Sequence, residues 1–273
     1  GLAAVSKGGT AGKAEIYTGY DAAVSALGEE DRLTKLIRIL LKNGAAAVAA
    51  VPVSEGGTEE YKAAFEALNK METVKLVVCD STEEAVQQAL RDSVKAASQA
   101  RMERIAVVEG AAGESAAQLV KRAESLNCER VVLAAPGAEE CPGELAAAVA
   151  GAIAGERDPA VPLGGAELAE VSVSGRWNDN DLDLLIRGGV TPVEESGGVV
   201  SVVRGVTTRT KTGTAADTTW RELTTILVVD EVIPGIRDAL RAGFRRVKNT
   251  EQTRGAIRSR VVMELEDRMK REI

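Results

Sequence analysis

The feature that most constrains this chain is a regular alternation of short apolar runs with helical patterns between Asp31 and Gly155. Each run is followed by apolar residues at three- and four-residue spacing, the period of an amphipathic helix. The runs occupy residues 47–53, 74–79, 105–108 and 131–134. Strands that are apolar throughout and alternate with helices predict a parallel sheet covered on both faces. We therefore expect an α/β domain over residues 20–160, built on a Rossmann-like parallel sheet layer.

The pattern changes after a stretch at 157–165 that is rich in Pro and Gly and marks a boundary. Beyond it we expect a smaller α+β carboxyl-terminal domain over residues 161–273. Its expected elements are a short helix at 178–187, a hairpin around Ser196-Gly197-Gly198, a polar Thr-rich loop at 207–217, and helices at 220–241 and 253–271. Residues 1–19 are expected to be a leader or the remnant of an arm.

The segment from Trp220 to Arg241 carries two conflicting signals. Its β-branched run, Thr224 to Val229, is typical of a strand. Its apolar residues nevertheless recur at intervals of three and four from Trp220 to Leu240, which favours a helix. We assign a helix that is disturbed at Pro234, where the backbone N–H is missing.

The chain contains no histidine among its 273 residues. This removes the commonest general base, the commonest metal ligand and every Ser-His or Cys-His pairing. The three cysteines, Cys79, Cys128 and Cys141, include no CxxC pair, which suits a reducing compartment. We therefore expect no catalysis, no cofactor and no metal.

Four local strings resemble ligand sites, and each has a structural interpretation that we prefer. Residues 8–13 resemble a phosphate loop but lack its first Gly and its final Ser or Thr, which favours a flexible loop. Residues 109–113 have two glycines where a dinucleotide loop needs three, which favours a plain turn. The acidic residues at 179–183 are better explained by a helix start than by calcium, and the Thr-rich string at 207–212 by a solvated loop.

The net charge of −7 hides an asymmetry along the chain. Residues 201–273 carry 15 Lys and Arg against 10 Asp and Glu, a net +5, whereas residues 1–200 carry 19 against 31, a net −12. Such a split fits complementary faces of a self-assembling subunit, an end that binds nucleic acid, or simply solvated helix faces. The basic end lacks interleaved aromatic residues, so it does not suit a stacking platform for single strands.

Several strings after residue 174, taken in order, resemble the carboxyl-terminal domain of contractile phage tail sheath proteins of the Mu-like, myovirus type. The strings are Trp177-Asn178-Asp179, Gly188-Gly189-Val190-Thr191-Pro192, Val202 to Thr210, Asp217 to Leu223, and Val229 to Pro234. The resemblance is good over residues 174–245 and loose over residues 15–160. It supports the helix assignment for residues 220–241.

The resemblance implies a structural subunit that stacks in six-fold rings around a tail tube and contracts by rigid-body rearrangement. It also implies that terminal arms add strands to the sheets of neighbouring subunits. The expected location is a virion tail assembled in the bacterial cytoplasm, without membrane or direct nucleic-acid contact. We expect the chain to be a fragment, because the family continues into strands beyond its last helix. The candidate assembly or tube-facing residues are Arg221, Arg237, Arg241, Arg254 and Arg258.

Two other functions remain open from the residues alone. The repeated βα units are compatible with a Rossmann-like nucleotide-binding enzyme, whose ligand would raise the melting temperature. The basic carboxyl-terminal part is compatible with nucleic-acid binding that weakens steeply with salt.

Overall fold

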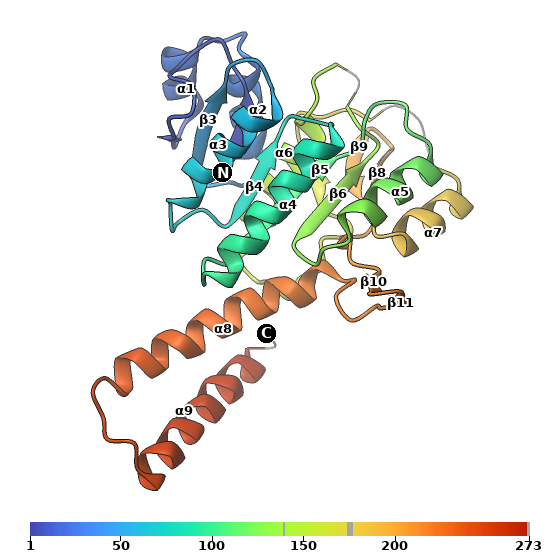
Figure 1. Cartoon of the computed structure of the whole chain (residues 1–273). Coiled ribbons are helices and arrows are strands. Elements are labelled where there is room, and N and C mark those ends of the chain that lie inside the picture. Colours follow the sequence, from blue (N-terminus) through green and yellow to red (C-terminus); the bar gives the residue numbers. More distant parts are fainter. Residues whose placement is uncertain (139, 174–176, 272–273) are drawn as a thin grey trace.

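The computed structural model describes residues 1–138, 140–173 and 177–271 of the chain. Residues 174–176, where the family resemblance begins, lie outside the described residues. Within the described ranges the chain forms a layered α/β body from which two long helices project (Figure 1).

Among the described residues, nine strands form one sheet in the order β2-β3-β1-β4-β5-β6-β8-β9-β7. The strands are β1 (Leu2–Val5), β2 (Glu15–Tyr17), β3 (Val48–Val53), β4 (Leu76–Cys79), β5 (Ile105–Glu109), β6 (Val131–Ala135), β7 (Glu167–Leu168), β8 (Thr191–Ser196) and β9 (Val199–Val202). Strands β3, β1, β4, β5, β6 and β8 run parallel, and β2, β9 and β7 pair antiparallel at the two ends. The predicted parallel sheet layer is confirmed.

Helices cover both faces of this sheet and create two apolar cores. They are α1 (Tyr20–Leu27), α2 (Arg32–Lys42), α3 (Thr58–Asn69), α4 (Glu84–Gln99), α5 (Ala116–Leu126), α6 (Glu144–Gly155) and α7 (Asp179–Arg187). One core joins α1, α2 and α6 to the sheet, and the other joins α3, α4, α5 and α7 to the opposite face. Ala, Val, Leu and Ile make up most of both cores, and Tyr17 lies in the first core and Tyr61 and Phe65 in the second.

Residues 1–19 are not the separate leader that the sequence predicts. Strand β1 lies between β3 and β4, with Leu2 and Ala3 fully buried, and β2 forms an edge of the same sheet. The prediction is wrong because β1 is a run of only four apolar residues, and Ala50 and Val78, the partners of its Leu2, are distant in the sequence. Local periodicity carries no signal for such a pairing.

The carboxyl-terminal part continues the sheet and does not start a new one. Strand β8 pairs parallel with β6, and the β8–β9 hairpin turns at Gly197 and Gly198 as predicted, both with φ above +60°. The loop after β9 contains a small two-stranded sheet, β10 (Lys211–Thr212) with β11 (Ala215–Ala216), within the region predicted as a loop. A domain boundary at residue 160 stays a prediction.

The two long helices, α8 (Leu223–Gly243) and α9 (Glu251–Lys270), form a hairpin that extends away from the body (Figure 1). The helical interpretation of residues 220–241 is confirmed, and α8 runs through Pro234. Only Leu223 and Ile226 of α8 are buried, and no residue of α9 is. The body is therefore well packed, whereas the hairpin contributes little to either core.

Candidate assembly surface

The carboxyl edge of the parallel strands is the place where a doubly wound enzyme would bind its ligand. If these five strands are renumbered in chain order, the sequence β3-β1-β4-β5-β6 reads 2-1-3-4-5, so the order in which the chain adds strands to the sheet reverses between β1 and β4. Asp80, which directly follows β4, fills this point. Its carboxylate accepts hydrogen bonds from the Val5 amide and the Arg32 guanidinium, both at 3.1 Å, and from the Tyr61 hydroxyl.

A second buried carboxylate, Glu109, closes the end of β5. Its oxygens accept the amides of Gly143 at 2.7 Å and Ala146 at 3.1 Å, at the start of α6. Burial raises the pKa of Glu109 to about 7, although these hydrogen bonds oppose the shift. In the turn that resembled a dinucleotide loop, a Cβ on Gly110 would collide with Leu119. The turn is therefore filled by the protein itself.

The thiols near this edge are not activated nucleophiles. Burial raises the pKa of Cys79 to about 12, and burial likewise raises the pKa of Cys141 to about 12, so both stay protonated at neutral pH. The edge is thus occupied by carboxylates and thiols that serve the packing of the body. This arrangement does not favour the nucleotide-binding alternative.

The strongest charge feature lies at the far end of the α8–α9 hairpin. Residues 241–260, which span the end of α8, the connecting loop and the start of α9, carry 7 Lys and Arg against 1 Asp or Glu. Since the whole chain has a net charge of −7, the remaining residues together carry a strongly negative net charge. Because the hairpin projects from the body, this basic tip presents its charge to solvent (Figure 1).

The structure divides the five predicted arginines into two groups. Arg241, Arg254 and Arg258 are exposed at the basic tip. Arg237 instead reaches back to the body, where it binds Glu103 at 2.8 Å. Arg221 is half-buried and lies just before α8 begins. Its backbone carbonyl accepts a hydrogen bond from the Thr207 amide.

Exposed apolar side chains also lie along the hairpin. They are Ile233 on α8 and Val262, Met263, Leu265 and Met269 on α9, and Met269 is 74% exposed. Ile257, Val261, Leu265 and Met269 recur every four residues along α9, but only the first two are half-buried, whereas Leu265 and Met269 are exposed. A helix pair that leaves large apolar groups in water is typical of a surface that contacts a partner.

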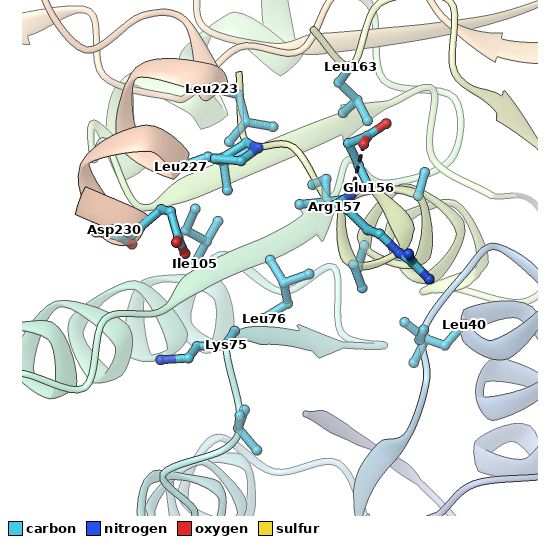
Figure 2. Close-up of a pocket in the computed structure, with 18 of the residues that line it drawn as sticks. Leu40, Lys75, Leu76, Ile105, Glu156, Arg157, Leu163, Leu223, Leu227 and Asp230 are labelled. Atoms are coloured by element: carbon cyan, nitrogen blue, oxygen red, sulfur yellow. Dashed lines mark hydrogen bonds between the residues drawn. The ribbon is translucent and has the colours of Figure 1, made fainter. Parts of the chain in front are cut away.

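An apolar cavity of about 610 Å³ lies between the first half of α8 and the amino ends of the central strands. Figure 2 shows Leu76 and Ile105 on the sheet side, and Leu223, Leu227 and Asp230 on the α8 side. No local pattern predicts this cavity, because its sheet side and its α8 side come from segments more than a hundred residues apart. Beside the cavity, ion pairs join α8 to the body.

The prediction of a solvated loop at 207–212 is wrong for its first residues, because Thr207 and Thr208 are fully buried and the Thr208 hydroxyl donates to the Cys128 carbonyl at 3.0 Å.

Asn178 caps α7 by accepting the Asp181 amide at 2.9 Å, so the acidic cluster marks a helix start. Lys13, in the loop that resembled a phosphate site, binds Glu15 at 3.0 Å. Within the part of the chain that the structure describes, no cluster of three or more His, Cys, Asp or Glu is placed to hold a metal ion.

Comparison with family models decides the identity of this fold. The model of the phage tail sheath protein central domain matches residues 55–208, more than half of the chain. The chain belongs to the phage tail sheath protein family. The resemblance found in the sequence is therefore confirmed, although the strongest strings lay partly beyond the matched residues.

Solved sheath structures share the fold of this sheath protein. A sheath tail protein from Desulfitobacterium hafniense superposes with a TM-score of 0.79 at 14% identity, over 99% of this chain and 86% of the other. The contracted helical sheath of the anti-feeding prophage gives 0.73 at 16%, over 99% and 76%. A sheath tail protein from Listeria innocua gives 0.72 at 12%, over 97% and 84%.

A search of curated proteins gives no match to this chain. Across the described residues, no helix combines the length and apolarity needed to cross a bilayer.

Proposed function

We propose that this chain is a structural subunit of a contractile tail sheath, which polymerises around a tail tube and contracts by rigid-body rearrangement. Membership of the sheath family supports the structural role. The likeness to the anti-feeding prophage sheath, solved in a contracted state, supports the contractile part of the proposal. Assembly takes place in the bacterial cytoplasm, and the product is a virion tail or a related injection machine.

The observation that carries the proposal is the α8–α9 hairpin. It projects from a closely packed body and exposes apolar side chains and a basic tip, and no other described segment of the chain covers them. A folded protein rarely leaves such a surface in water without a partner. We assign this surface to assembly, with the basic tip facing an acidic partner such as the tail tube.

The role requires no catalysis, cofactor or nucleic acid. The carboxyl edge of the sheet is filled by Asp80 and Glu109, whose hydrogen bonds tie the strands to neighbouring elements. A nucleotide-binding enzyme would instead be stabilised by its ligand in proportion to RT ln(1 + [L]/Kd). A thermal shift with NAD, ATP or S-adenosylmethionine therefore opposes the proposal, and unchanged melting temperatures support it.

The tip is tested by co-sedimentation of the complete protein with its tail tube. Replacing Arg241, Arg254 and Arg258 by Gln removes three positive charges from the basic tip. The control variant replaces Arg101, Arg157 and Arg187, which are exposed on the body, and lowers the net charge equally.

We expect the tip variant to lose at least tenfold in tube binding while the control stays within about twofold, since charge complementarity acts locally. Equal losses in the two variants contradict the assignment of the tip to the tube. Binding of DNA by the tip, with a steep salt dependence, would favour the nucleic-acid function instead.

A further inference from the structure

The contacts between α8 and the body change along the helix. After its first turn, in which Leu223 and Ile226 enter the core, α8 has no buried residue. Below it lies the cavity of about 610 Å³, so the apolar walls of helix and sheet are not in full contact there (Figure 2). Other contacts must hold this part of the helix.

Two ion pairs join α8 to the amino edge of the sheet. Arg130, immediately before β6, binds Asp230 with both arms of its guanidinium, at 2.6 and 2.9 Å. Glu103, two residues before β5, accepts Arg237 at 2.8 Å. The side chains of Arg130 and Asp230 are only 13% and 15% exposed, and that of Glu103 is 9% exposed, so water screens these pairs weakly.

The polarity of the two pairs alternates. The sheet edge presents a carboxylate at Glu103 and a guanidinium at Arg130, and α8 presents the opposite charges in the matching order. Asp230 and Arg237 are seven residues apart, two helical turns or about 10 Å, and therefore face the same side. If α8 slid by that distance, Asp230 would face Glu103, and two like charges would meet.

We infer that Arg130–Asp230 and Glu103–Arg237 form an ionic clasp that fixes the register and angle of the α8–α9 hairpin against the body, and that the clasp opens without unfolding the sheet. Opposite polarity selects one register and rejects the displaced one. The cavity leaves room beside the helix, so the hairpin can change its angle once the pairs separate. The inference concerns a single chain in solution and does not depend on assembly.

Hydrogen exchange of the full chain, followed by mass spectrometry, tests the clasp. Arg237→Gln removes one pair, and the swapped variant Glu103→Arg with Arg237→Glu rebuilds it with reversed polarity. Arg241→Gln is the matched control, because Arg241 lies one turn further along α8 and, among the described residues, forms its ion pair within the helix, with Asp238 at 3.6 Å.

We expect Arg237→Gln to accelerate exchange in residues 229–243 by about tenfold, the effect of losing a charge-assisted hydrogen bond, with residues 105–109 unchanged. The control should match the wild type, and the swapped pair should restore protection to within about threefold. Unchanged exchange in α8 overturns the inference. So does acceleration of α8 and β5 to the same extent, or a swapped variant as fast as Arg237→Gln.

Discussion

Replacing Arg104 by Met should destabilise the fold by about 3 kcal/mol. Arg104 is fully buried, no carboxylate of the described residues pairs with it, and burial lowers its pKa. Its guanidinium donates to the carbonyls of Leu68 at 2.8 Å and Met71 at 2.6 Å, and more weakly to Asn69. These oxygens lie at the carboxyl end of α3, where a positive charge is also favoured by the helix dipole.

The magnitude follows from the two short hydrogen bonds. Mutational values of about 1.5–3 kcal/mol for a hydrogen bond to a charged group already include the desolvation of that group. The carbonyls of Leu68 and Met71 also accept the Met71 and Val74 amides, so each loss is partial and the lower end of the range applies. Met keeps most of the apolar volume of the Arg104 stem, so the change in packing adds little to the loss of stability.

The assay is urea unfolding at pH 7 followed by circular dichroism. Arg258→Met is the control, since Arg258 is exposed on α9, and a change within about 0.5 kcal/mol is expected there. Arg104→Lys should fall between the wild type and Arg104→Met, because it keeps the charge with fewer donors. A cost below about 1 kcal/mol for Arg104→Met would mean that burying the charge outweighs its hydrogen bonds, and would refute the reasoning.

Three further predictions follow from particular contacts. Because burial raises the pKa of Glu109 from its ordinary 4.5 to about 7, the contribution of this group to stability is fully present below pH 4.5 and is lost as pH rises to 7. At about 1.4 kcal/mol per pKa unit, this contribution to the free energy of unfolding falls by about 3 kcal/mol. Urea unfolding of Glu109→Gln across the same pH range should not show this fall. Gly235→Ala places a Cβ against the Arg268 guanidinium that binds Glu231 at 3.1 Å, so hydrogen exchange in α9 should accelerate several-fold. The free energy of unfolding should stay the same or rise by up to about 1 kcal/mol, because Ala favours a helix more than Gly does. Unchanged exchange in α9 contradicts this prediction. The Cys79 thiol, 1% exposed and with its pKa raised to about 12, should resist iodoacetamide at pH 7.5 until urea unfolds the chain.

The central part of the fold could be predicted because its signals are local. The apolar runs that became β3, β4, β5 and β6 are each bounded by turn residues, and the helices between them show their own period. The helix α8 could also be predicted, since the apolar spacing from Trp220 to Leu240 is a stronger signal than its β-branched run. The body of the chain thus consists largely of segments whose secondary structure can be predicted from their own local patterns.

The features that were missed depend on residues far apart in the sequence. Strand β1 pairs Leu2 with Ala50 and Val78, and the ion pair of Arg130 with Asp230 spans 100 residues. Arg237 was predicted as an assembly residue because an arginine on a helix face looks the same whether it meets solvent or a buried carboxylate. Only the Glu103 contact distinguishes it from Arg241 at the tip.

Electron microscopy of the complete protein tests the central claim, that the partners of this chain are copies of itself arranged around a tail tube. The account predicts hollow tubes or stacked rings with six-fold symmetry, and shorter, wider tubes after contraction. A complete protein that remains monomeric at high concentration, with and without its tube, would contradict it.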